Sequence, residues 1–212
     1  MKPRLSPCCR RLSPRSPGLW AALCVLASTG CSLLPQAQPD PTRFYVLSTT
    51  AAGAVPQPNA PSVHLREVEL TDYLKGRPVI VRRGDNEIEF REFARWGEPL
   101  DLGIARVLRE ELVARGAASG VRTPGSHREH PKYDAVLSVR VLAAEGGPHG
   151  AVNFRATWEL SSPDAKVGIL ARGDFRASNL HWDGKTEASL ASQLSQAVAE
   201  LAADISAALL KK

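Results

Sequence analysis

The sequence predicts an α+β fold, with a largely antiparallel sheet and two helices packed on one face. Three segments, at 135–141, 152–160 and 167–175, alternate apolar and polar residues, which is typical of half-buried strands. Two other segments, at 99–115 and 186–210, repeat their apolar residues with the spacing of a helix. Two helices on one side of a largely antiparallel sheet form an α+β architecture.

Residues 1–30 have the composition of an export signal. Five basic residues and no acidic residue precede a short apolar run, GLWAALCVLA, from Gly18 to Ala27. This run is about half as long as a membrane-spanning helix needs, so a secretory signal peptide is favoured over a transmembrane anchor. Without the five basic residues of this segment, the chain has 22 basic and 22 acidic residues, so the rest of it carries no net charge. Because a nucleic-acid partner requires a basic patch, no such partner is expected.

Cys31 is the only cysteine after this segment, so it has no internal disulfide partner. It ends the stretch LASTGC, which resembles the lipobox where bacterial lipoproteins receive diacylglycerol. Ser28 departs from that pattern, because an aliphatic residue is usual three positions before the cysteine. We expect Cys31 to be the lipid-attachment residue. The alternative is ordinary cleavage at the small-x-small site Ser28-x-Gly30, which would release a soluble protein.

The rest of the chain divides into a tether and a single domain. Prolines at positions 35, 39 and 41 give residues 31–42 the composition of an extended, semi-rigid linker. Residues 43–212 have the length of one domain. The expected organisation is a lipoprotein signal peptide at 1–30, a lipidated N-terminus and proline-rich tether at 31–42, and one periplasmic α+β domain at 43–212.

Within this domain the elements follow in order. The first strands are expected in RFYVLST, SVHLREVEL, RPVIVRR and NEIEFREF, with a tight hairpin turn at Gly84-Asp85 between the last two. A helix is expected from Pro99 to Arg115, ending at Gly116. The three alternating segments then form an antiparallel meander. The last helix is expected from Thr186 to Leu210, capped by Asp183 or Thr186.

No pattern of catalytic residues is present. His127 and His130 could be a pair of metal ligands, but they lie in a polar loop and no third ligand is close in sequence. The sequence has no nucleophile elbow, P-loop or dinucleotide-binding glycine pattern. We therefore expect a protein that is not an enzyme, with no catalytic residue, no metal site and no cofactor.

A dense run of aromatic and charged residues, 73–101, carries a resemblance to a known family. Tyr73-Leu74, Arg77-Pro78 and especially the run from Arg95 to Leu100, RWGEPL, resemble the PqiC family, the ABC-type transport auxiliary lipoproteins. Taken by itself, this run predicts a strand-to-helix corner with Trp96 buried against the sheet. The alternative is a partner-binding surface. Its candidate residues are Tyr73, Leu74, Arg95, Trp96 and Glu98.

The resemblance implies a role in lipid transport across the bacterial envelope. It implies a non-enzymatic tether or adaptor, held by Cys31 on the periplasmic face of the outer membrane; Ser32 after the cysteine fits that destination. The implied partners are an MCE-domain protein that bridges the periplasm and an inner-membrane transporter component. Docking to such a bridge would favour a symmetric homo-oligomer. The alternative function is a periplasmic lipid-binding shuttle, which needs an apolar pocket for acyl chains.

Overall fold

One mixed sheet of nine strands dominates the residues that the computed structural model describes, which are 38–51, 57–124 and 132–211. The described elements belong to a compact unit, Pro41–Lys212. Cys31, the signal segment and the loop with His127 and His130 lie outside the described residues. In chain order the elements are β1 (Arg43–Tyr45), β2 (Ser62–Leu65), β3 (Glu69–Leu70), β4 (Pro78–Arg82), β5 (Ile88–Trp96), α2 (Leu100–Ala114), β6 (Gly120–Arg122), β7 (Ala135–Gly146), β8 (Val152–Ser161), β9 (Ile169–Arg176) and α3 (Glu187–Leu209).

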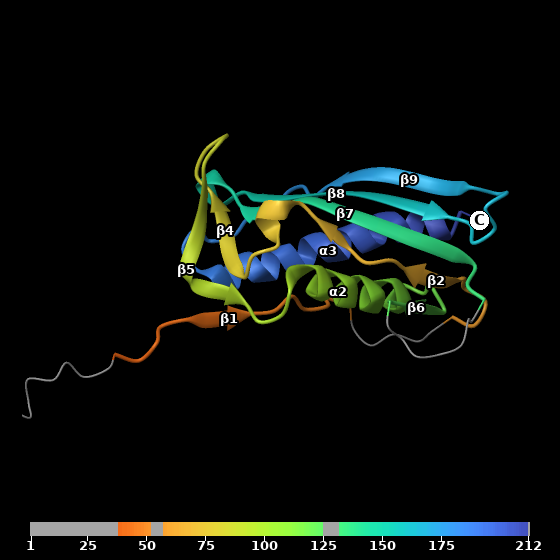
Figure 1. Ribbon diagram of the computed structural model, residues 1–212, viewed down its shortest axis with the longest axis horizontal. Coiled ribbons are helices and arrows are strands. Elements are labelled where there is room, and N and C mark those ends of the chain that lie inside the picture. The colour runs from red at the N-terminus through yellow and green to blue at the C-terminus, as the bar shows by residue number, and fades with distance from the viewer. Residues whose placement is uncertain (1–37, 52–56, 125–131, 212) are drawn as a thin grey trace, which may run out of the picture. The chain divides into compact units, whose positions relative to one another are not determined.

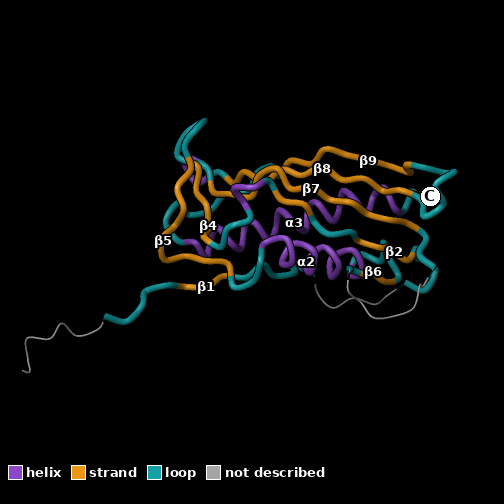
Figure 2. Tube along the Cα trace, in the orientation of Figure 1, coloured by secondary structure: helices purple, strands orange, loops and turns teal. Residues whose placement is uncertain are grey.

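Strands β7, β8 and β9 form the antiparallel meander that the sequence predicts (Figure 1). Every second residue of β8 is buried, from Phe154 to Leu160, because successive side chains of a strand point to opposite faces. Both helices run along one side of this meander (Figure 2). The predicted α+β fold, with two helices on one face of a largely antiparallel sheet, is confirmed.

The shorter strands join the meander in a way that the sequence does not indicate. The order across the sheet is β1-β5-β4-β7-β2-β6, and β2, β3 and β4 each pair with β7 in parallel. Strand β1 is also parallel to β5, and β2 to β6. The expected single strand SVHLREVEL is therefore two strands, β2 and β3, and β6 is an additional strand that periodicity did not predict.

The predicted hairpin joins β4 to β5 around Gly84-Asp85. The register between β4 and β5 shifts within the pair. Ile80 pairs with Phe90, whereas Pro78 pairs with Arg95, so two residues along β4 correspond to five residues along β5. This irregularity lets the end of β5 turn toward β1. The same strand therefore pairs with β4 through residues 88–90 and Arg95, and with β1 through residues 94–96.

The two helices begin and end within about one residue of their predicted limits. Gly116 lies just after α2 with a φ of +67°, a conformation that favours glycine, and it ends the helix as expected. Thr186 caps α3, because its side chain accepts a hydrogen bond from the Ser189 amide. None of the helices in the described ranges has the length and apolar character needed to cross a bilayer.

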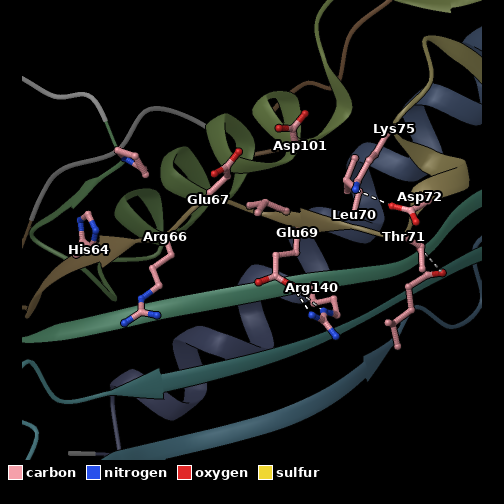
Figure 3. Close-up of a pocket in the computed structure, with 13 residues that line it drawn as sticks. His64, Arg66, Glu67, Glu69, Leu70, Thr71, Asp72, Lys75, Asp101 and Arg140 are labelled. Atoms are coloured by element: carbon pink, nitrogen blue, oxygen red, sulfur yellow. Dashed lines mark hydrogen bonds and ion pairs between the residues drawn. The ribbon is translucent and has the colours of Figure 1, made fainter.

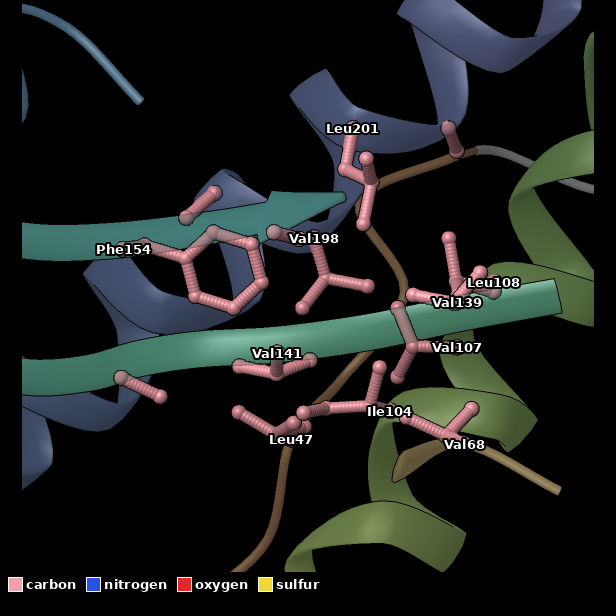
Figure 4. Close-up of a cluster of buried hydrophobic side chains, with 14 of the residues drawn as sticks. Leu47, Val68, Ile104, Val107, Leu108, Val139, Val141, Phe154, Val198 and Leu201 are labelled. Atoms are coloured by element: carbon pink, nitrogen blue, oxygen red, sulfur yellow. The ribbon is translucent and has the colours of Figure 1, made fainter. Parts of the chain in front are cut away.

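The core lies between the meander and the helices (Figure 4). Val139 and Val141 of β7 meet Val198 of α3 and Ile104 of α2 there, and all four are buried. Phe154 of β8 lies in the same layer and packs edge-on against Phe175 of β9. Burying these side chains is the main source of stability for a domain of this size.

Candidate functional site

The run RWGEPL forms a strand-to-helix corner, as the sequence predicts. Strand β5 ends at Trp96 and α2 begins three residues after Gly97. The Trp96 amide donates to the Arg77 carbonyl at 2.7 Å, and the Gly97 amide donates to the Tyr45 carbonyl at 2.7 Å. Trp96 itself is buried. The corner is therefore fastened to the segment before β4 on one side and to β1 on the other.

The Glu98 side chain links this corner to α2. Its carboxylate accepts a hydrogen bond from the Arg106 guanidinium at 2.5 Å, and the same guanidinium donates to the Leu47 carbonyl at 2.7 Å. The hydrogen bond to Glu98 raises the pKa of Arg106. Because both contacts use Arg106 of α2, they hold the helix, the corner and the chain after β1 together.

Tyr73 and Leu74 lie in a 3₁₀ turn, Asp72–Leu74, before β4. Leu74 is buried, and the Tyr73 hydroxyl donates to the Leu142 carbonyl at 3.3 Å. Burial, and then the neighbouring Glu145 carboxylate, raise the pKa of Tyr73. Tyr73 thus contacts β7 and Leu74 belongs to the buried core, whereas Gly97 of the corner contacts β1.

Arg95 is the exposed member of the five predicted partner-binding residues. It is aligned with Phe44 in the parallel pairing of β1 and β5. Exposed and buried residues alternate from Phe93 to Trp96, so Phe93 and Arg95 share the exposed side of β5. Val46 is also exposed and lies over Gly97, where an added Cβ would approach the valine Cγ1 at 3.2 Å. We call Phe44, Val46, Phe93 and Arg95 the β1–β5 surface.

The three apolar members of this surface were not among the residues predicted from the sequence. The strand RFYVLST alternates, with Phe44 and Val46 on one side and Tyr45 and Leu47 on the other. That pattern could have indicated two different faces. It could not indicate which face the core covers, because both are apolar.

A hollow of about 950 Å³ opens beside β3 and the segment before it (Figure 3). Two ion pairs cross or border it, Arg140 to Glu69 at 2.8 Å and Lys75 to Asp72 at 2.6 Å. A pocket for acyl chains is lined mainly by apolar side chains. This hollow has a mixed lining instead, in which the apolar side chains Val68, Leu70, Pro124 and Leu142 lie among charged ones: Arg66, Glu67, Glu69, Asp72, Lys75, Asp101 and Arg140.

Two buried carboxylates lie elsewhere in the domain, and both have hydrogen-bonding partners. Glu145 accepts from Arg82 Nε at 2.5 Å and from Asn153 Nδ2 at 2.7 Å. Glu111 on α2 accepts from the Thr50 amide at 2.6 Å and from the Ala51 amide at 3.0 Å. Within the described residues, no cluster of three or more potential ligands could hold a metal ion.

Comparisons with known proteins agree with the fold. A family model described as ABC-type transport auxiliary lipoprotein component matches residues 45–206. A crystal structure of an uncharacterized protein is 19% identical, with a TM-score of 0.63, covering 78% of this chain and 97% of that one. A Xanthomonas campestris protein of the DUF330 family is 14% identical, also with a TM-score of 0.63, covering 78% of this chain and 93% of that one. A search of curated proteins gave no match.

Proposed function

This chain belongs to the family of ABC-type transport auxiliary lipoprotein components, and from that membership we propose that it is an outer-membrane adaptor of an intermembrane lipid transport system. In this role it performs no chemistry and needs no cofactor. It holds the far end of an MCE-domain protein at the periplasmic face of the outer membrane. The family match over residues 45–206 is the observation that carries the proposal.

The anchor in this proposal is Cys31, acylated after removal of residues 1–30. One acyl chain binds a bilayer weakly, whereas two or more on one residue hold a protein firmly. A polyproline conformation rises about 3.1 Å per residue, so the tether at 31–42 would place the domain within about 35 Å of the bilayer. This spacing suits an adaptor that meets a partner reaching across the periplasm.

We propose that the partner docks on the outer face of the meander, which points away from the helices. Two rows of aligned residues cross that face, Ser138-Glu159-Arg172 and Arg140-Thr157-Asp174. Charges of both signs at an interface provide specificity and orientation. The corner residues Trp96 and Glu98, and likewise Tyr73 and Leu74, contribute by holding this sheet in shape.

The experiment is a capture of partners from detergent-solubilised envelopes, with wild type compared with Cys31→Ala. Recovery of an MCE-domain protein with wild type supports the adaptor. Intact-mass measurement of the same samples reports whether Cys31 carries acyl chains. Arg172→Glu should reduce the capture without loss of the fold, since Arg172 is exposed; Lys211→Glu, an exposed change at the C-terminal end of α3, is the matched control.

The alternative function, a lipid-carrying shuttle, predicts a different result in the same preparation. A shuttle would retain about one extractable lipid per chain after purification, in addition to the acyl chains on Cys31. The charged residues among the lining of the hollow beside β3, with the ion pair of Arg140 and Glu69, favour the adaptor over the shuttle, because acyl chains would have to lie against them. Stoichiometric bound lipid together with no captured partner would contradict our proposal.

A further inference from the structure

The β1–β5 surface combines exposed apolar side chains with arginine. Phe44 is 64% exposed, Val46 53% and Phe93 48%. Isolated exposed apolar residues are ordinary, but several on one face bordered by polar groups mark a contact surface. Because none of these three contributes to the core, the folded domain itself does not explain their apolar character.

The charges around this surface are mainly positive. Arg95 belongs to it, and Arg77, whose carbonyl accepts from the Trp96 amide, is exposed on the segment before β4. Glu92 is the exposed acidic neighbour on β5. Aromatic and basic side chains together are the composition that proteins use at the boundary between lipid headgroups and acyl chains.

The position of this surface in the chain, shortly after Cys31, indicates what it contacts. Arg43 lies twelve positions after Cys31, and even a fully extended chain of that length spans only about 40 Å. Phe44 and Val46 follow at once, so they are the part of the domain closest in sequence to the anchor. A tethered surface meets the bilayer at a high effective concentration, and a weak intrinsic affinity is then enough for contact.

We propose that the β1–β5 surface rests on the headgroup layer of the bilayer that holds Cys31. The Phe44 and Phe93 rings lie at the edge of the acyl region, and the Arg95 guanidinium lies beside lipid phosphates. This inference rests on the proposed function, since the tether brings the surface to the bilayer only if Cys31 is acylated. It orients the domain and leaves the outer face of the meander free for the partner.

The test uses the purified lipoprotein in vesicles of phosphatidylethanolamine and phosphatidylglycerol. Because Cys31 is the only cysteine from residue 31 onward, an introduced cysteine offers a single thiol for an environment-sensitive fluorophore. Val46→Cys places the probe on the β1–β5 surface, and Val167→Cys, at a similarly exposed valine before β9, is the matched control. We expect brominated lipids to quench the probe at position 46 several-fold more than the probe at position 167.

A second variant tests the contribution of the rings. Phe44→Ser combined with Phe93→Ser, in the Val46→Cys background, should reduce the quenching at position 46 while circular dichroism stays unchanged. Equal quenching at positions 46 and 167 overturns the inference. A blue shift at position 46 that depends on protein concentration and needs no lipid also overturns it, and assigns the surface to a second copy of the chain.

The number of fluorophores bound per chain distinguishes failure of this inference from failure of the proposed function. With Cys31 acylated, each single-cysteine variant takes up one fluorophore and the wild type takes up none. A free Cys31 would raise each value by one, which would contradict both the anchor and the membrane contact. One fluorophore per chain without quenching at position 46 contradicts the membrane contact alone.

Discussion

Trp158 on β8 donates its indole N–H to the Asp204 carboxylate of α3 at 2.8 Å. The tryptophan is buried, and its ring covers Gly173 of β9, its aligned neighbour in the sheet. An added Cβ at Gly173 would come within 2.8 Å of the indole ring atoms Cε2, Cζ2 and Nε1. The Trp158 side chain thus links α3 to β8, and its ring leaves space only for glycine at position 173 of β9.

This relationship predicts that Gly173→Ala destabilises the domain. Overpacking of a buried contact costs about 1–3 kcal/mol, because the ring must move and strain its hydrogen bond to Asp204. Trp158→Phe removes the atoms that the new methyl group would meet. In a double-mutant cycle, Gly173→Ala should therefore cost less in the Trp158→Phe background, as measured by urea denaturation. Additive effects would show that the two positions do not interact.

The ion pair between the partly exposed Arg82 and the buried Glu145 gives a second prediction. Arg82→Ala leaves the Glu145 carboxylate buried without a cation, a loss of about 3–5 kcal/mol in comparable pairs. Replacing both, as Arg82→Met with Glu145→Leu, should recover part of that loss because no isolated charge remains. Arg83→Ala is the control: its pair with Glu89 is largely exposed, so its change in unfolding free energy should stay below about 1 kcal/mol.

Glu111 gives a third prediction, because its carboxylate holds the chain that follows β1. Oε1 accepts bonds from the amides of Thr50 and Ala51 and from the hydroxyls of Thr49 and Thr50. Glu111→Ala leaves these donors without their acceptor, and we expect a loss of about 2–4 kcal/mol. Glu111→Gln keeps an acceptor oxygen and should cost less. Hydrogen exchange of the Thr50 and Ala51 amides should accelerate in the alanine variant before global unfolding.

The pH dependence of stability provides a fourth prediction. Burial tends to raise the pKa of Glu111, but the hydrogen bonds from Thr49, Thr50 and Ala51 outweigh it and lower that pKa below its ordinary value of 4.5. A carboxyl whose pKa is lowered by folding stabilises the native state above its unfolded pKa. That contribution declines as the pH falls below about 4.5 and through the folded value. Unfolding curves at pH 7 and pH 4 should therefore differ more for wild type than for Glu111→Gln.

The cap of α3 provides a fifth prediction. Thr186→Ala removes the oxygen that accepts from the Ser189 amide, so the unfolding free energy should fall by about 1 kcal/mol. Thr186→Ser retains a hydroxyl and should lie close to wild type in the same thermal melts. An alanine variant as stable as wild type would indicate that solvent replaces the cap at no cost.

Local periodicity explains which parts of the fold could be predicted from sequence. The meander and both helices depend on side-chain spacing within one segment, and a single segment is enough to detect it. The parallel pairings join distant residues, such as Arg43 with Ala94 and Glu69 with Arg140, and no local pattern encodes them. Strands β3 and β6 span only two and three residues, too few to show a period.

The same reasoning applies to the candidate site. Burial of Trp96 follows from an aromatic residue at the end of an alternating strand, and it is confirmed. The partner of Arg82 could not be predicted, because Glu87 and Glu89 of the same hairpin lie much closer in sequence and are the acids expected opposite it. Only Arg83 forms such a pair, with Glu89; Arg82 reaches Glu145, 63 positions along the chain.

The hydrogen bonds of Glu111 have a mechanical consequence. Strand β1 is aligned with β5 over only three residues, so the strand alone resists little force applied to the chain that precedes it. Any pull transmitted along the backbone beyond Leu47 arrives at residues 49–51, which are hydrogen-bonded to the Glu111 carboxylate near the C-terminal end of α2. The load then passes into a helix packed in the core, so a pull strong enough to peel β1 stops at these hydrogen bonds before it unravels the rest of the domain.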